Sequence, residues 1–215
     1  MGLLEGDVLD DARAIVARYP EGRERSAVMP LLYLVQSIEG SVTREGMREI
    51  GELLGITTAE VEAVATFYTM YRMHPTGEHL IAVCTNLACM LRGARDVLRE
   101  ALDAAGQRPG EEISDDGLFS VHEEECLGVC DFAPVAQIDV ANHDSLTPAR
   151  MRELIEALRA GEAPTPARGP SFVSFKQACR VLAGLDQPAA AVAVASAPAA
   201  PAPSTTPNLA EGSDP

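Results

Sequence analysis

The sequence predicts an α+β protein: an N-terminal helical bundle, then a small α/β domain with a mixed sheet, then a disordered C-terminal tail. Three observations indicate this order. Apolar residues recur at helical spacing over about the first 70 positions, strand and helix patterns alternate in the middle of the chain, and the end is rich in Ala and Pro. We therefore place the helical bundle at 1–75, the α/β domain at 76–161, a linker at 162–186 and the tail at 187–215.

The N-terminal segment carries the signals of four helices. The first two helices are predicted from apolar residues that recur at helical spacing. Thr43 is placed to cap a third helix that ends near Gly55. Thr57 and Glu60 form a capping box that opens the fourth helix, in the segment VEAVATFYTMY.

The middle segment has the strand and helix patterns of an α/β domain. LIAVC is a short β-rich run, residues 90–105 have helical spacing, and LFSVHE and VAQIDV are two further strand candidates. Thr147 as a cap, with Pro148 at the first helical position, begins a helix that ends at Gly161. Strand, helix, strand, strand, helix is an order that favours helices packed on a mixed sheet.

After Gly161 the chain is dominated by prolines and small residues. They are interrupted by SFVSFKQACRVLAGL, for which the pattern predicts a short helix or a turn-rich segment. From about residue 187 the composition is rich in Ala, Pro and Ser and cannot bury enough apolar surface to offset chain entropy. We expect this tail to be disordered.

Composition and charge exclude several classes of function. The chain has 17 Lys and Arg against 32 Asp and Glu, and its net charge of -15 repels phosphate backbones, which argues against nucleic-acid binding. The longest apolar run, around 189–202, is broken by prolines and is too short for a membrane span. The N-terminus lacks the basic region of a secretory signal. We expect a cytoplasmic protein without direct membrane insertion.

Four of the five cysteines form two pairs, Cys84-x4-Cys89 and Cys126-x3-Cys130, in loops that follow predicted strands. Cytosolic cysteines more often serve metal or redox chemistry than disulfides. A [2Fe-2S] cluster needs four thiolates, two on each iron, and Gly128 lets the second loop adopt a positive φ close to a sulfide. Zinc remains an alternative because its sites also use C-x2–4-C pairs. The remaining interpretations are a redox dithiol, although no thioredoxin-type C-x-x-C is present, and plain buried cysteines.

The remaining candidates favour ordinary roles. Cys179 lies on a predicted helix face, where burial as a small apolar side chain is expected. The histidines are scattered rather than paired at ligand spacing. His122 is an exception, since it lies four residues before Cys126 and its charge could couple reduction of a cluster to the uptake of a proton.

Three segments around these cysteines carry a resemblance. ATFYTMY at 65–71, VCTNLACMLRG at 83–93 and ECLGVCDFAPV at 125–135 occur in this order. Together they resemble the thioredoxin-like [2Fe-2S] subunit family of NADH:quinone oxidoreductase (respiratory complex I), known in bacteria as the E subunit. The resemblance covers about residues 5–160.

The resemblance implies a thioredoxin-like fold for the α/β domain and one [2Fe-2S] cluster. Cys84 and Cys89 would bind one iron, and Cys126 and Cys130 the other. It also implies a partner flavoprotein subunit that carries FMN and binds NADH, together with other peripheral-arm subunits of complex I. The chain would then be a non-catalytic electron-carrier subunit of a proton-translocating enzyme, peripheral on the cytoplasmic face of the inner membrane.

The residues agree that hydride chemistry lies elsewhere, because the chain has no G-x-G-x-x-G fingerprint and no P-loop. We assign no catalytic residue to it. Two alternatives stay open: the equivalent subunit of a soluble NAD-linked formate dehydrogenase or hydrogenase, and a zinc-stapled structural adapter. The segment from Gly161 to Leu185 and the tail have no assured counterpart in the family.

The acidic side chains around the second cysteine pair allow two interpretations. Glu123, Glu124 and Glu125 are either a solvated face or, with Asp131, negative charge that lowers the reduction potential.

The aromatic residues Phe67, Tyr68 and Tyr71 could contact the cluster domain or the flavoprotein, but helical spacing favours the core. Phe132 and Pro134 are expected to shield the cluster loop from water.

Overall fold

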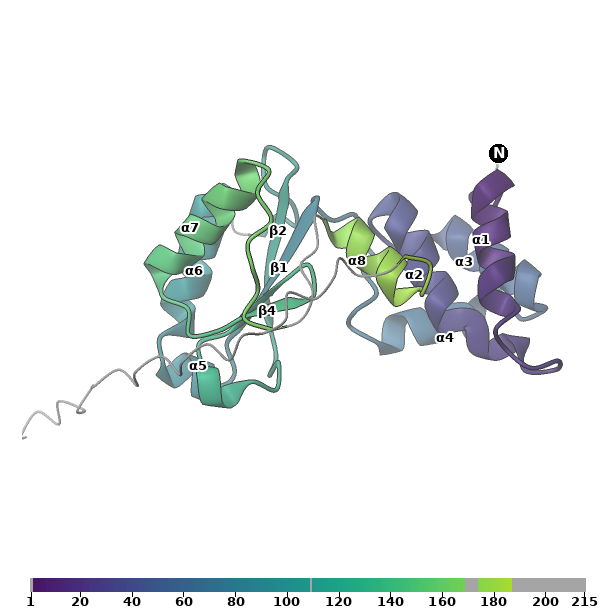
Figure 1. Ribbon diagram of the computed structural model, residues 1–215, viewed down its shortest axis with the longest axis horizontal. Coiled ribbons are helices and arrows are strands. Elements are labelled where there is room, and N and C mark those ends of the chain that lie inside the picture. The colour runs from purple at the N-terminus through teal and green to yellow at the C-terminus, as the bar shows by residue number, and fades with distance from the viewer. Residues whose placement is uncertain (1, 109, 169–173, 187–215) are drawn as a thin grey trace, which may run out of the picture.

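The computed structural model describes residues 2–108, 110–168 and 174–186. Figure 1 shows two lobes, one made of helices and the other of a sheet with helices on one face. The α+β class is confirmed. The predicted tail at 187–215 lies outside the described residues.

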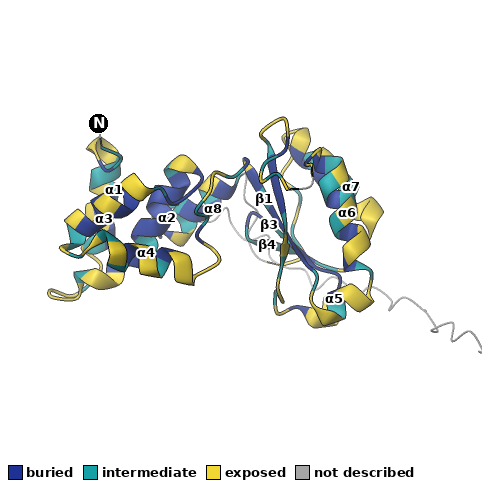
Figure 2. Ribbon diagram, turned by 180° about the vertical axis from the view of Figure 1, so that it is seen from behind, coloured by how far each residue is buried: buried dark blue, intermediate teal, exposed yellow. Residues whose placement is uncertain are grey.

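The first lobe contains the four predicted helices. They are α1 (Gly6–Val16), α2 (Val28–Glu39), α3 (Arg44–Leu54) and α4 (Thr58–Phe67), with a 3-10 turn, η1 (Glu24–Ala27), before α2. Two predicted caps are present: the Thr43 side chain accepts a hydrogen bond from Gly46 N, and Thr57 and Glu60 form a capping box. Helix α2 runs through the centre and is buried on most sides, as the dark blue in Figure 2 shows.

A fifth helix of this lobe comes from the far end of the described chain. Helix α8 (Phe175–Leu182) lies against α2, and Phe175, Cys179 and Ala183 belong to the helical core (Figure 1). Lys176 Nζ donates to Ile38 O at 2.7 Å. The short helix expected within 162–186 is therefore present, and it packs as part of the helical lobe.

The second lobe is built on a four-stranded mixed sheet. Its strands are β1 (His79–Cys84), β2 (Phe119–Glu124), β3 (Ala136–Ile138) and β4 (Ala141–His143), in the order β2-β1-β3-β4. Strands β1 and β2 are parallel, and the other two pairs are antiparallel. Helices α6 (Ala94–Ala105) and α7 (Pro148–Arg159) pack on each other and cover one face of the sheet (Figure 1).

Two predicted elements of this lobe need correction. The helix expected over 90–105 is two helices, because Gly93 has φ +92° and separates α5 (Leu87–Leu91) from α6. The single strand expected over VAQIDV is a hairpin. Asp139 and Val140 have φ +48° and +66°, which turns the chain back between β3 and β4.

The two lobes meet at the start of β1. Leu80 and Val140 pack against the helical core, and Phe175 N donates to Glu78 O at 3.0 Å. The buried His79 and Asp139 lie beside this contact, with Nδ1 and Oδ2 2.7 Å apart. The sheet is thus fixed to the helices through β1, the strand that ends at Cys84. Among the described residues, no helix combines the length and apolar character needed to cross a membrane.

His143 provides a pH-dependent component of stability. Burial, with a smaller effect of the Arg150 cation, lowers the pKa of His143 to about 4. An unfolded histidine has a pKa of about 6.5, so between these values the unfolded state binds a proton that the folded state excludes. The free energy of unfolding should therefore fall by about 3 kcal/mol as the pH drops from 7 to 4. Urea titrations at several pH values should show a shallower decrease for His143→Gln, and equal decreases would contradict this assignment.

Candidate metal centre

The parallel pairing of β1 and β2 brings all four paired cysteines to one edge of the sheet. Cys84 is the last residue of β1 and lies opposite Glu124, the last residue of β2. Cys89 lies in α5, just after β1, and Cys126 and Cys130 lie in the loop after β2. Carboxyl ends of neighbouring parallel strands open at the same edge, which is why residues far apart in sequence meet here.

Backbone hydrogen bonds hold the two cysteine loops together. Cys84 N donates to Val135 O at 3.1 Å, and Thr85 N donates to Glu124 O at 3.2 Å. Asn86 caps α5 by accepting from Leu87 N at 2.7 Å. The loop positions are therefore set by the sheet and by a helix cap.

The four thiols lie as two pairs. Cys126 Sγ and Cys130 Sγ are 3.4 Å apart, and a hydrogen bond links the side chains of Cys84 and Cys89. The hydrogen bond with Cys126 is the main cause of the raised pKa of Cys130, and the charge of Cys84, from the other pair, makes a smaller contribution. Within the described ranges, no three His, Cys, Asp or Glu side chains gather around one point in the way a single ion requires.

The chemistry of this donor set fits a binuclear cluster. A [2Fe-2S] cluster takes thiolates from four cysteines shared between its two irons, whereas a structural zinc ion draws four ligands to within about 2.3 Å of one centre. The two-plus-two arrangement matches the first requirement. Gly128 supports it, because its φ is +77° and its N–H donates to Cys126 Sγ at 3.4 Å.

The two pairs differ in environment. Cys84 and Cys89 are buried in a small apolar cluster with Ala94 and Ala133, whereas Cys126 and Cys130 are exposed. Burial, followed by the hydrogen bond with Cys84, raises the pKa of Cys89 to about 11. The Gly128 N–H lowers the pKa of Cys126. One end of the site is thus shielded from water and the other end faces outward.

Carboxylates surround the exposed end. Asn86 Nδ2 donates to Glu125 Oε2 at 3.0 Å, and the Thr85 hydroxyl donates to Glu123. Asp131 follows Cys130 directly and is exposed. Hydrogen bonds therefore attach Glu123 and Glu125 to the loop after β1. These bonds were not predicted from the sequence, although Asn86, a typical helix-capping residue before an apolar turn, could have indicated a polar contact here.

His122 and the apolar residues of the second loop are close to the site without joining it. His122 Nε2 lies 3.5 Å from Glu124 Oε2, and burial, followed by the nearby Arg72 cation, lowers the pKa of His122. Pro134 is buried as expected. Phe132 is exposed, and the Arg168 guanidinium lies 4.5 Å above its ring.

Other sequence candidates lie elsewhere. Cys179 is fully buried in the helical lobe, where its Sγ accepts from Gln36 Nε2 at 3.3 Å. Burial raises the pKa of this thiol to about 12, as expected for an inert core residue. The core prediction is correct for Tyr71 and wrong for Phe67 and Tyr68, which are 77% and 37% exposed.

Comparison with known proteins shows similarity to one family and to subunits of one enzyme. The model of the thioredoxin-like [2Fe-2S] ferredoxin family matches residues 12–159. The chain is 43% identical over 178 residues to the E subunit of NADH-quinone oxidoreductase from Mycobacterium tuberculosis, covering 81% of this chain and 68% of that protein. It is 42% identical over 163 residues to NADH-quinone oxidoreductase subunit 2 of Thermus thermophilus, covering 75% and 89%.

A solved NAD+-reducing [NiFe]-hydrogenase, in the H2-reduced state, shares the fold. The TM-score is 0.53 at 22% identity, over 62% of this chain and 23% of that one.

Proposed function

The chain belongs to the thioredoxin-like [2Fe-2S] ferredoxin family, among the E subunits of NADH-quinone oxidoreductase, and from this premise we propose that Cys84, Cys89, Cys126 and Cys130 bind its cluster. The observation that carries the proposal is the meeting of two thiol pairs at the carboxyl ends of β1 and β2. We assign Cys84 and Cys89 to one iron and Cys126 and Cys130 to the other. The chain carries electrons and has no catalytic residue of its own.

The residues of the chain prepare the site for electron exchange. A bound [2Fe-2S] cluster takes up and releases one electron at a time. Burial of Cys84 and Cys89 keeps water from one end, and the exposed Cys126 and Cys130 shorten the path to a partner at the other. The Gly128 N–H stabilises negative charge on Cys126 Sγ, while the neighbouring Glu125 carboxylate opposes it. Together these groups set the reduction potential.

The partner that we propose for the exposed end is the flavoprotein subunit that carries FMN and binds NADH. Membership in the enzyme complex implies other subunits, and a one-electron carrier beside a flavin splits the electron pair that NADH delivers. We further propose that the complex holds the chain on the cytoplasmic face of the inner membrane. The hydrogenase alternative has less support, because 43% identity to an E subunit exceeds 22% identity to a hydrogenase.

Reduction by NADH tests the proposed function directly. The purified chain with its cluster should not be reduced by NADH alone. Once the FMN-containing subunit is added, NADH should reduce the cluster. Bleaching of the visible absorption and the EPR signal of the reduced cluster both detect this reduction. A cluster that stays oxidised with NADH and the flavoprotein, yet is reduced by dithionite, would reject exchange with this partner.

Neutralising the glutamates should raise the midpoint potential. In the triple variant Glu123→Gln, Glu124→Gln and Glu125→Gln, three negative charges near the exposed thiols are removed, and an added electron is repelled less. Because exposed charges at this range contribute roughly 1 kcal/mol or less each, the expected rise is on the order of 50 mV. An EPR-monitored redox titration measures it. The variant Glu52→Gln, on the helical lobe, is the control, and an unchanged or lower midpoint in the triple variant contradicts the prediction.

A further inference from the structure

Two groups of large apolar side chains are exposed. The first, which we call the α4 patch, consists of Phe67, Tyr68 and Met70 at the end of α4. The second, the α5 patch, consists of Leu87, Met90 and Leu91. Phe67 is 77% exposed and Leu91 is 75% exposed, and grouped apolar side chains with polar residues around them are typical of interaction surfaces.

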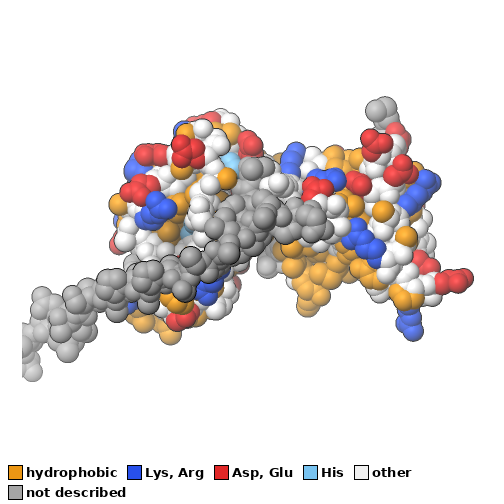
Figure 3. Space-filling view, viewed as in Figure 1, with side chains coloured by type: hydrophobic (Ala, Val, Ile, Leu, Met, Phe, Trp, Pro, Cys, Tyr) orange, Lys and Arg blue, Asp and Glu red, His pale blue; other side chains and the backbone are white. Residues whose placement is uncertain are grey.

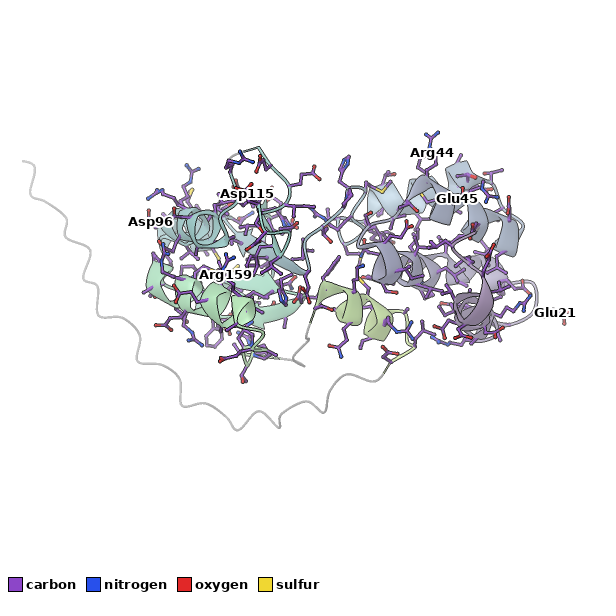
Figure 4. All side chains as sticks on the ribbon, turned by 90° about the horizontal axis from the view of Figure 1, so that it is seen from above. Glu21, Arg44, Glu45, Asp96, Asp115 and Arg159 are labelled. Carbon is purple, nitrogen blue, oxygen red and sulfur yellow. The ribbon has the colours of Figure 1, made fainter. Side chains whose placement is uncertain are left out.

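These patches lie on a surface that carries many charged side chains. Charged side chains such as Glu45, Asp96 and Asp115 project from both lobes (Figure 4). Figure 3 shows the largest group of hydrophobic side chains at the lower edge of the helical lobe, where α4 ends. Figures 1 and 2 place α5 and the end of α4 on this same side of the molecule, one on each lobe.

The α4 patch is held in place before any partner binds. The Phe67 and Tyr68 rings meet edge to face at 4.9 Å, and Tyr68 meets Tyr71 at 6.4 Å. Tyr71 is buried, lies 5.0 Å from the Tyr33 ring, and donates from its hydroxyl to Met29 O at 3.0 Å. A row of rings therefore leads from the core to the exposed Phe67. Rigid aromatic groups lose little entropy on binding, so they are typical anchors of protein interfaces.

The α5 patch lies beside the exposed thiols and their carboxylates. Leu87 and Leu91 belong to the helix that contains Cys89, and Asn86 next to Leu87 holds Glu125. We call Glu123, Glu125 and Asp131, all exposed, the acidic collar. A partner that covers the α5 patch must face this collar, and positive charge on the partner would complement it.

The collar also argues against a second copy of the chain as the occupant. A two-fold dimer pairs the same surface of both copies, so a dimer formed through the α5 patch would bring two acidic collars together. With a net charge of -15, two copies also repel each other at long range. The geometry points to a different protein.

We propose that the α4 and α5 patches are two anchor points for one protein partner, the subunit that exchanges electrons with the cluster. This proposal rests on the proposed function. The partner contributes an apolar pocket for Phe67 and Tyr68, an apolar surface for Leu87 and Leu91, and basic residues opposite the acidic collar. Docking on both lobes fixes the orientation of the exposed thiols toward the electron donor.

Photo-crosslinking in the assembled complex tests which protein covers each patch. The residues Phe67, Leu91 and Leu182 are replaced one at a time by p-benzoylphenylalanine. Leu182, 44% exposed on α8, is the matched apolar control. The proposal expects positions 67 and 91 to crosslink to the FMN-containing subunit and position 182 not to do so. A crosslink from position 67 to a second copy of this chain, to another subunit or to nothing overturns it.

Affinity for the FMN-containing subunit gives a second measurement. Phe67→Asp should weaken binding by about 30-fold, as loss of an interface anchor does, whereas Leu182→Asp should leave it unchanged. The EPR signal of the cluster should be the same in both variants. If Phe67→Asp binds the FMN-containing subunit as tightly as the unaltered chain does, and its cluster is intact, the α4 anchor is overturned and the cluster assignment stands. If the unaltered chain itself gives no EPR signal of a reduced cluster, the proposed function is rejected instead.

Discussion

Replacing Cys126 by Ala is expected to abolish the cluster. The variant removes one of two thiols on the exposed end, and one remaining thiol, Cys130, cannot hold an iron that needs two protein ligands there. Iron should drop from about two per chain to near zero, and the EPR signal of the reduced cluster should disappear. Because Cys126 is exposed and the loop backbone is held by the sheet, the fold itself should survive, which circular dichroism checks.

Cys179→Ala is the matched control for that variant. Cys179 lies in the helical core and takes no part in the two pairs. It should keep full iron and an unchanged EPR spectrum, at a modest cost in stability for the lost sulfur. Loss of iron in Cys179→Ala, or retention of a full cluster in Cys126→Ala, would show that the ligands are assigned wrongly.

Replacing Phe175 by Ala should produce the largest loss of stability among these variants. Phe175 is 2% exposed and begins α8, which lies against α2 and is joined to the sheet lobe by the bond from Phe175 N to Glu78 O. Truncating a buried Phe typically costs about 3–5 kcal/mol, because apolar contact is lost and a cavity remains. Urea unfolding followed by circular dichroism measures the difference in the free energy of unfolding.

Leu182→Ala controls for helix propensity, since it alters the same helix at an exposed position. Its expected effect is within about 0.5 kcal/mol. If the free energy of unfolding falls equally little in both variants, α8 contributes no packing energy and behaves as the linker that the sequence suggested. If Phe175→Ala alone is destabilised, the helical lobe depends on a segment outside the residues matched by the family model.

Local signals were enough to predict the first four helices and the cysteine pairs. The capping box of Thr57 and Glu60 and the cap at Thr43 act within a few residues, so they can be recognised without knowledge of the fold. The spacing of the cysteines identified two pairs but left zinc open. Only the parallel register of β1 and β2 places the pairs together as two sets of two.

Features that depend on distant contacts could not be predicted. The hairpin turn at Asp139 is stabilised by its buried contacts with His79 and with Leu80 N, which lie about 60 residues earlier. Likewise, Phe67 has the spacing of a core residue, but α4 ends there and the chain turns away, which leaves the ring outside. At Asp139 tertiary packing overrides a local pattern, and at Phe67 the end of the helix does so.

EPR spectroscopy of the anaerobically purified chain, before and after dithionite, with iron, sulfide and zinc assayed on the same sample, tests the central claim most directly. The four-cysteine site predicts a rhombic spin-half signal that appears only on reduction, with about two irons and two sulfides per chain. A colourless, EPR-silent protein that holds one zinc ion, even after reconstitution with iron and sulfide, would contradict the electron-carrier account and favour a structural zinc site.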